Sequence, residues 1–420
     1  MTMSSHVATL DSPVRNKRGA YLIVVLFLIG LYLPTSIGGV QSHALVALPI
    51  PLFLLGFTLL LALNGMGNYW LRVIGCCIPA TVLLCSFISP FPITDVGPIY
   101  SYCMLGILYT VKLKVEGSEY FPALRKGLFG ANLISAILGV GIILQYGPIL
   151  DFLMEHYTYF YPELLPIMFA MRKPVLTFGS HSVGGFFQFL FFWMNLRTYE
   201  VNKSVSNLCF AIMYMIFSLF LFSFTSLFFL SCEVVLLLTL LLKRSWKLTL
   251  VGMLILGCAG LVLSSQVDKD LQQRFADYAT AVLQSQGNGL AGRYSSATGD
   301  LVGNLVFLHD NPWRPVGVTG SKNLFFVDSG PIEYMLRGSL PLVLLIYSGC
   351  VIFLTSNLRD KKDMLVIIGA VFVFEVGFAI LPFARMMFAF PFVLAYLNSL
   401  QNLSAQANRV NDSLLTAEWS

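Results

Sequence analysis

Residues 205–242 read VSNLCFAIMYMIFSLFLFSFTSLFFLSCEVVLLLTLLL and contain one charged side chain, that of Glu233. Two apolar runs, 205–222 and 225–242, fill this stretch and are separated only by a short turn. A helix needs roughly 20 predominantly apolar residues to cross the core of a bilayer. The stretch therefore predicts two consecutive membrane-spanning helices.

The rest of the chain has the same character. Of its 420 residues, 57% are hydrophobic and 11% are charged, and the mean hydropathy is +0.77. These values exclude a soluble domain with an ordinary polar surface. We predict an all-α polytopic membrane protein with about twelve transmembrane helices, forming a single integral membrane domain, 1–420. The expected spans are 19–37, 44–63, 73–92, 97–111, 127–146, 184–196, 205–222, 225–242, 248–264, 339–356, 364–382 and 386–400.

Lysine and arginine residues are distributed unevenly between the connecting segments. If the N-terminus is cytoplasmic, the inner segments hold 17 of the 26 cations and the outer segments hold 9, as the positive-inside rule requires. We therefore expect both termini in the cytoplasm. Two long outer loops, 147–183 and 265–338, carry eight of the nine outer cations. Either these loops were translocated regardless of charge, or they attract an anion.

Several kinds of site and segment are not predicted. All eight cysteines lie in expected spans, so neither a disulfide framework nor a metal site is indicated. The sequence has no P-loop, G-x-S-x-G or H-E-x-x-H motif, and neither a cofactor nor a nucleic-acid partner is expected. The first apolar run is long enough to span and follows RNKRG, so we expect it to stay as a helix and not to be cleaved as a signal peptide.

The first outer loop ends in a cationic segment. Arg172 and Lys173 precede Pro174 and the turn TFGSHS. The planar fork of an arginine can hold two phosphate oxygens, whereas a lysine acts as a point charge. The alternative is that both side chains extend to lipid headgroups. His181 is either a proton acceptor or a polar cap on the helix that begins near Val183.

The second outer loop predicts short amphipathic helices. Apolar residues follow helical spacing over 271–282 and again over 301–308. The second pattern begins after Arg293 and ends at the sequence HDNP, 309–312. Pro312 and Gly317 then favour a loop.

A further short helix is predicted just before the next span. Asp328-Ser329-Gly330-Pro331 is typical of a helix start, and Gly338 and Pro341 should interrupt the helix. Glu333 and Arg337 stand at i and i+4, the favourable order for an ion pair. The alternative is that Arg337 and the N-terminus of this broken helix face an anionic ligand.

Three ionisable residues lie in or beside predicted spans. Glu233 and Glu375 are costly in hydrocarbon and are functional candidates by default, although Glu233 follows Ser231 and could be buried with hydroxyl partners. Arg385 lies at the outer boundary of the last span, where a phosphate-bearing lipid would pass, and its alternative role is to extend to a headgroup.

The order of these features resembles that of the Wzy-type O-antigen polymerases, whose superfamily also contains the O-antigen ligases. The resemblance is carried by a Gly-Arg pair at 292–293, an apolar helix ending in NPW, the turn PVGVTG and then DSGPIEYMLRGSLPLVL. Ligases tend to have a His-Asn pair where this chain has Asp328-Ser329, which favours the polymerase branch. The turn SFTSLF between the seventh and eighth spans lacks the Ser-Arg often seen in the family.

The resemblance implies a GT-C-like fold and a metal-independent glycosyltransferase in the bacterial inner membrane. Its substrates would be undecaprenyl-diphosphate-linked oligosaccharide repeat units, joined on the periplasmic face, and a chain-length regulator is a candidate partner. Cations would hold the diphosphate as the glycosidic bond breaks, and a base would activate the acceptor hydroxyl. The diphosphate-binding candidates are Arg172, Arg293, Arg337 and Arg385, followed by Lys173 and Arg314. The candidate bases, in order, are Asp328, His181 and Glu333.

Two other functions remain as alternatives. An O-antigen ligase would transfer the glycan to the lipid A core. A lipid-linked oligosaccharide flippase would also have about twelve spans, but it would carry polar residues along a central pathway and an internal repeat, which the sequence does not clearly show.

Overall fold

The computed structural model describes residues 13–41, 48–89, 91–92, 97–114, 117–158, 164–221, 223–244, 300–313, 315–319 and 329–417. Within these residues the chain is almost entirely helical, apart from a small antiparallel hairpin of β1 (Ser36–Ile37) and β2 (Val40–Gln41). The predicted all-α class is confirmed for this part of the chain. The helices are α1 (Pro13–Tyr32), α3 (Pro49–Asn64), α4 (Tyr69–Ile88), α5 (Gly97–Thr110), the 3-10 turn η1 (Ser118–Tyr120), α6 (Phe121–Ile143), α7 (Gly147–His156), α8 (Leu164–Ala170), α9 (His181–Asn202), α10 (Val205–Phe220), α11 (Phe224–Arg244), α15 (Asp300–Asp310), α16 (Gly330–Asn357), α17 (Lys361–Gly377) and α18 (Ala384–Ala417).

Most of the predicted apolar runs coincide with helices. Eleven of the twelve runs overlap a helix of the structure, and the ninth, 248–264, lies outside the described residues. Among those residues, three helical segments are long and apolar enough to cross a membrane: Tyr69–Ile88, Ser118–Ile143 and Gly330–Asn357. Such segments define a helical membrane protein. The number of spans and the GT-C-like arrangement stay predictions.

Local sequence explains where several helices begin. Proline occupies the first turn of α3, α6, α7 and α16, where its missing N–H removes no hydrogen bond. Asn68 caps α4 by accepting from the backbone N–H of Trp70 at 3.2 Å. Asp360 caps α17 by accepting from the N–H of Lys362 at 2.8 Å. Both caps satisfy a donor that the helix itself leaves open.

Helix α9 forms the centre of the bundle. Nearly every residue from Val183 to Tyr199 is buried, because α10, α11, α17 and α18 pack around this helix. The ring of Phe186 meets Phe374 of α17 edge-on, with the centroids 4.9 Å apart. A helix that is apolar on all sides must be surrounded by other elements. The position of α9 therefore determines the positions of its neighbours.

A small set of polar side chains is buried where α6, α9 and α10 meet. Asn132 and Asn195 donate to each other's side-chain oxygens at 2.9 and 3.1 Å. Asn207 donates to Asn195 at 3.0 Å, and Tyr214 donates to Asn132 at 3.1 Å. These groups satisfy one another, which removes the large cost of burying them unpaired. Their mutual pairing indicates a role in helix association.

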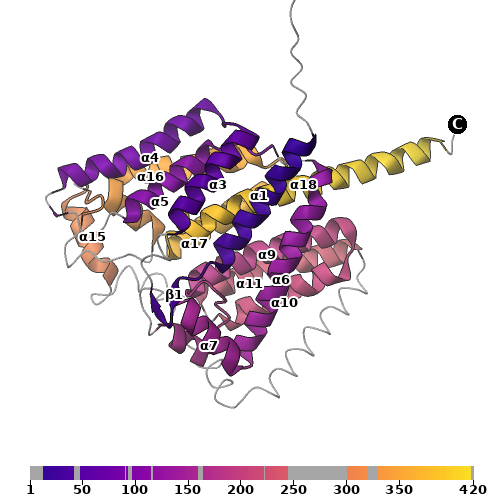
Figure 1. Cartoon of the computed structure of the whole chain (residues 1–420), viewed down its shortest axis with the longest axis horizontal. Helices are drawn as coiled ribbons and strands as arrows, with labels where there is room; N and C mark the ends of the chain where they lie inside the picture. The colour runs from indigo at the N-terminus through magenta and orange to yellow at the C-terminus, as the bar shows by residue number, and fades with distance from the viewer. Residues whose placement is uncertain are drawn as a thin grey trace, which may run out of the picture.

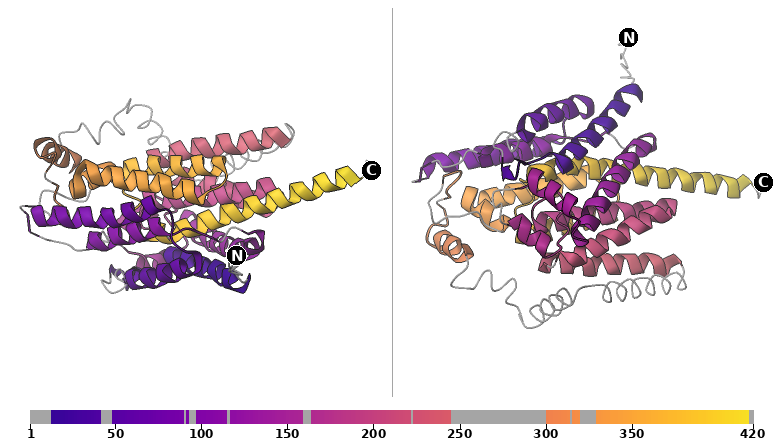
Figure 2. Two further views of the ribbon diagram at one scale, coloured as in Figure 1. Left: turned by 90° about the horizontal axis from the view of Figure 1, so that it is seen from above. Right: turned by 60° about the horizontal axis from the view of Figure 1, so that its bottom comes forward.

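The two ends of the bundle differ (Figures 1 and 2). Helices α7 and α15 and the β hairpin lie toward one end, whereas α18 extends beyond the other. We call the first of these the α15 end. The start of α16, the turn 171–180 and the start of α18 lie there as well, since hydrogen bonds join them to one another or to neighbouring turns. This is the end that the cation distribution predicts to be periplasmic, and its orientation in a membrane stays a prediction.

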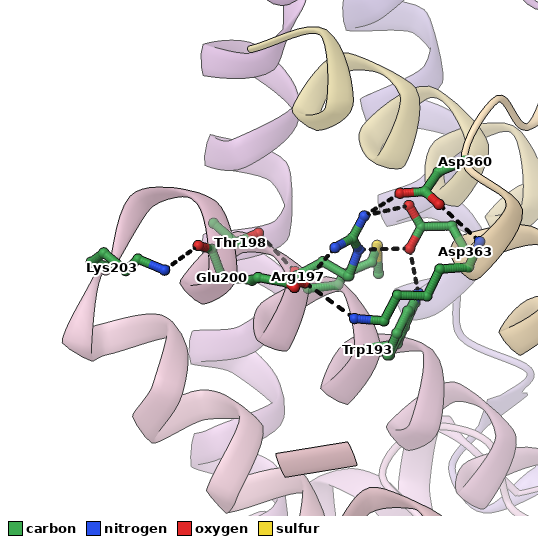
Figure 3. A network of polar contacts seen from close by, with 9 residues as sticks. Trp193, Arg197, Thr198, Glu200, Lys203, Asp360 and Asp363 are labelled. Carbon is green, nitrogen blue, oxygen red and sulfur yellow. Dashed lines mark hydrogen bonds and ion pairs between the residues drawn. The ribbon is translucent and has the colours of Figure 1, made fainter. Parts of the chain in front are cut away.

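A network of charged side chains joins α9 to α17 at the opposite end (Figure 3). Arg197 donates to Asp363 at 2.8 Å and to Asp360 at 2.6 Å, and it also pairs with Glu200. Trp193 donates its indole N–H to Asp363 at 3.0 Å. The carboxylate of Asp363 is almost fully buried, with 2% of the side chain exposed. The network therefore compensates a charge that would otherwise be costly to bury.

Candidate functional site

The start of α16 is a separate short helix at the α15 end. Gly338 and Ser339 are non-helical, and Ser339 has a φ of 59°. The interruption predicted at Gly338 is therefore confirmed. Ser339 donates its hydroxyl to the carbonyl of Pro312 at 2.5 Å, which ties the break to the turn that follows α15. Residues 330–337 thus end at a break that is fixed by the turn after α15.

The predicted glycine turn, 315–319, lies between α4 and this short helix. Val316 donates its N–H to the carbonyl of Leu336 at 2.7 Å, and Val318 donates to the hydroxyl of Ser86 near the end of α4 at 2.9 Å. Arg337 donates to the carbonyl of Gly317 at 2.8 Å. The turn therefore holds the guanidinium of Arg337 against the end of α4.

Gly317→Ala should destabilise this region. Gly317 has a φ of 59°, and a Cβ there would collide with both the hydroxyl and the backbone nitrogen of Ser86. The left-handed conformation alone costs about 1–2 kcal/mol for a residue with a Cβ, and the collision with backbone adds to it. We expect a lower midpoint of thermal unfolding in detergent. Gly369→Ala is the matched control, because nothing lies within 4 Å of its added Cβ. An unchanged midpoint for Gly317→Ala would contradict the close contact between Gly317 and Ser86.

Glu333 and Arg337 form the ion pair that their spacing predicts. Arg337 Nε lies 2.8 Å from Glu333 Oε1, and the side chains are 18% and 8% exposed. The pair lies on the short helix itself, one turn apart. The geometry fixes the direction of the guanidinium, since one edge donates to Glu333 and a second nitrogen donates to Gly317. Whether Arg337 also binds an anionic ligand stays a prediction.

Arg385 joins three segments at the start of α18. It donates to the carbonyls of Leu31 at 3.0 Å, Leu33 at 3.0 Å and Thr177 at 2.7 Å, and to the hydroxyl of Thr177 at 3.1 Å. Its guanidinium also lies over the ring of Tyr157 with the centroid at 5.8 Å. The residue is 7% exposed. Its guanidinium is thus turned into the protein, and it connects the end of α1 with the turn that carries Arg172 and Lys173.

The three predicted residues of the first outer loop lie close together in the chain and are partly exposed. Arg172 adopts a left-handed conformation with a φ of 55°, in the turn that follows α8. Lys173 follows it, and burial lowers the pKa of its ammonium group because desolvation disfavours the charged form. His181 is the first residue of α9, after the N-cap residue Ser180. His181 is therefore at the helix start and not ahead of it, and its role as a base stays a prediction.

The two carboxylates predicted inside spans are both buried, with different partners. Glu233 of α11 is 0% exposed and accepts a hydrogen bond from Ser218 of α10 at 3.3 Å. The alternative drawn from the sequence, burial with a hydroxyl partner, is therefore present in the structure, and the partner is Ser218; Ser231 donates to the carbonyl of Leu227. Glu375 of α17 is 1% exposed and lies against the first residue of α16.

An open apolar groove runs between α15 and the short helix. It has a volume of about 540 Å³ and is lined by Leu305, Val306, Leu308 and His309 of α15 and by Ile332 and Met335 of α16. The helix predicted over 301–308 is confirmed by α15, which ends at Asp310. Glu333 and Arg337 belong to the same two turns of α16 as the two residues of the groove. An apolar surface and a charged pair are thus adjacent on one short helix.

Part of the predicted site cannot be compared with the structure. Asp328, Arg293, Arg314 and the amphipathic helix expected over 271–282 lie outside the described residues. In the part of the chain that is described, no group of three His, Cys, Asp or Glu side chains could hold a metal ion. The sequence did not single out Thr177 or Ser86, since a lone hydroxyl gives no signal of the distant segment that it contacts.

Comparisons with known proteins identify no relative. No family model, no curated protein and no solved structure matches the chain.

Proposed function

We propose that the protein is an O-antigen polymerase that joins undecaprenyl-diphosphate-linked repeat units by glycosyl transfer. The observation that carries the proposal is the apolar groove of α15 and α16 beside the Glu333–Arg337 pair. A substrate with a long hydrocarbon chain and a charged head needs both surfaces next to each other. The groove suits the lipid chain, and the arginine suits the diphosphate because its planar fork binds pairs of phosphate oxygens.

The gathering of further polar groups at the same end supports the proposal. Arg385 binds the turn 171–180 directly, and this turn brings Arg172, Lys173 and His181 to the end of the bundle where α16 begins. The second outer loop supplies Arg337 and Glu333. Two loops that are distant in the sequence thus lie at the same end of the bundle, which supports a site for a donor and an acceptor.

In the proposed reaction, a hydroxyl oxygen of the acceptor repeat unit attacks the anomeric carbon of the donor glycan. The bond between that carbon and the diphosphate oxygen breaks, and the lipid diphosphate leaves with the electron pair. Cations stabilise the charge that develops on this oxygen, and Arg337 is the foremost candidate in the described part of the chain. The acceptor proton passes to a base, for which Asp328, His181 and Glu333 are the candidates.

The polymerase proposal predicts a ladder of products from the purified protein. With a defined lipid-diphosphate repeat unit as sole substrate, we expect chains of two or more units, separated by gel electrophoresis. A ligase would need a lipid A core acceptor, and its loss from cells would leave no glycan on lipid A, whereas loss of a polymerase would leave single repeat units. Folded protein that produces no chain longer than one unit contradicts the proposal.

The location that accompanies this function is the bacterial inner membrane, with the α15 end in the periplasm. Reporter fusions check this orientation. A reporter that is active only in the cytoplasm should be active when it is fused after Ala417, and a reporter that is active only in the periplasm should not. A periplasmic C-terminus would put the α15 end on the wrong side for the proposed substrates.

A further inference from the structure

Glu375 is a buried carboxylate that contacts two elements of the α15 end. It lies near the end of α17 and is 1% exposed. Its Oε1 accepts from the hydroxyl of Tyr334 at 3.0 Å and from the backbone N–H of Leu381 at 2.7 Å, and its Oε2 accepts from the hydroxyl of Tyr347 at 3.3 Å. A carboxylate in such a place is costly, and here three donors compensate it.

The carboxylate of Glu375 also packs closely against the start of α16. A Cβ at Gly330, the first residue of α16, would collide with Glu375 Oε2. The partial positive charge of a helix N-terminus favours a nearby anion, so the carboxylate and the helix start stabilise each other. The helix N-terminus, for which an anionic ligand is one of the two alternatives drawn from the sequence, thus lies against a carboxylate of the protein itself.

The contact with Leu381 connects the same carboxylate to Arg385. Leu381 belongs to the turn between α17 and α18, and Arg385 follows it by four residues. Tyr334 is adjacent in sequence to Glu333 and lies within one turn of Arg337. Glu375 therefore links two segments by hydrogen bonds. One is the short helix that carries Arg337, and the other is the turn that leads to Arg385.

We propose that Glu375 is a positioning residue that sets the placement of the Glu333–Arg337 pair relative to Arg385. The inference rests on the proposed glycosyl transfer for its kinetic consequence, but the placement itself does not depend on that function. Glu375 acts through its hydrogen bonds and does not contact the substrate. An amide of the same shape should therefore preserve the placement in large part, whereas an apolar side chain should lose it.

Kinetics of the purified protein test this role. A misplacement of about 1 Å can lower a rate about 100-fold, so Glu375→Leu should lower kcat by about that factor with KM nearly unchanged. Glu375→Gln should stay within about threefold of the wild type, because it can keep an acceptor for Tyr334 and Leu381. Glu233→Leu is the matched control, since it removes another fully buried carboxylate of the bundle and should leave kcat unchanged. Equal losses in Glu375→Gln and Glu375→Leu would overturn a positioning role.

A distance measurement tests the placement without any turnover. Spin labels on genetically encoded amino acids at positions 40 and 313 leave the native cysteines in place, and both positions are exposed, at 71% and 72%. Position 40 reports on the hairpin that follows Leu33, a partner of Arg385. Position 313 reports on the turn bound to Ser339 of α16.

We expect one narrow distribution of the distance between the two labels in the wild type, in Glu375→Gln and in Glu233→Leu. In Glu375→Leu we expect this distance distribution to be shifted or broader. An unchanged distribution in Glu375→Leu would overturn the proposal. If Glu375→Leu does not fold, Tyr334→Phe replaces it, because it removes the hydroxyl that donates to Glu375. A broader distance distribution in Tyr334→Phe would then support the positioning role, and an unchanged one would overturn it. Absence of polymer from the wild type would reject the proposed function and leave the distance result standing.

Discussion

Arg337→Ala should abolish long-chain glycan in a host that lacks its own polymerase. The guanidinium is fixed by Glu333 and the carbonyl of Gly317, on the short helix that also lines the apolar groove. Removal of one preorganised group that stabilises developing negative charge costs about 100- to 1000-fold in rate. Such a loss would remove the ladder on an immunoblot. Arg337→Lys keeps the charge but not the fork, so we expect it to retain only part of the activity.

Two controls separate loss of catalysis from loss of folding. Arg337→Ala leaves the carboxylate of Glu333 buried without its ion pair, which is destabilising in itself. The double variant Glu333→Gln, Arg337→Ala removes that charge, so its folding shows whether the unpaired carboxylate causes any instability of Arg337→Ala; its activity is not used, because Glu333 is itself a candidate base. Arg72→Ala changes an exposed arginine at the opposite end of the bundle and should leave the ladder intact. A wild-type ladder from folded Arg337→Ala protein would remove the assignment of this residue.

Arg197→Ala should be the most destabilising single substitution in the charged network of α9 and α17. Its guanidinium donates to Asp363 and Asp360 and pairs with Glu200. Without it, the nearly buried carboxylate of Asp363 loses its ion-pair partner and retains the indole N–H of Trp193. Breaking a buried pair by removal of one partner costs about 3–5 kcal/mol. We expect a correspondingly lower free energy of unfolding in detergent, followed by tryptophan fluorescence.

The matched control for this substitution is Lys203→Ala at the end of the same helix. Lys203 is exposed and donates to the carbonyl of Glu200, so its loss should change the free energy of unfolding by less than about 1 kcal/mol. The variant Arg197→Ala, Asp363→Asn should recover part of the loss, because it removes the uncompensated charge. Equal stabilities of Arg197→Ala and Lys203→Ala would show that the network does not hold the two helices.

Much of the helix pattern could be predicted from local sequence. Apolar runs of sufficient length become helices because each helix satisfies its own backbone hydrogen bonds in an apolar surrounding. The ends of α15 and of the short helix at 330–337 were also predictable, since Pro312 and Gly338 act within their own turn. The ion pair of Glu333 and Arg337 belongs to the same category, because residues four apart share a helix face.

The candidate site could be predicted only in part. Arg385, Arg337 and the turn 171–180 stand out by their charge, but charge alone does not show where a side chain points. The structure turns Arg385 inward to the carbonyls of Leu31 and Thr177. Arg197 lies in a predicted inner segment, and nothing near it in the sequence indicates that it holds a buried network, because its partners Asp360 and Asp363 are more than 160 residues away.

The sequence by itself determined the membrane class of the protein, the positions of most helices and the break in α16, because these depend on contacts within one segment and on its transfer out of water. Only the tertiary structure decided which segments share an end and which charges neutralise one another. Glu375 illustrates the difference. Its cost in an apolar span is evident from the sequence, but its compensation by Tyr334, Tyr347 and Leu381 depends on three segments meeting in space, and the strength of hydrogen bonds and ion pairs is decided by that geometry.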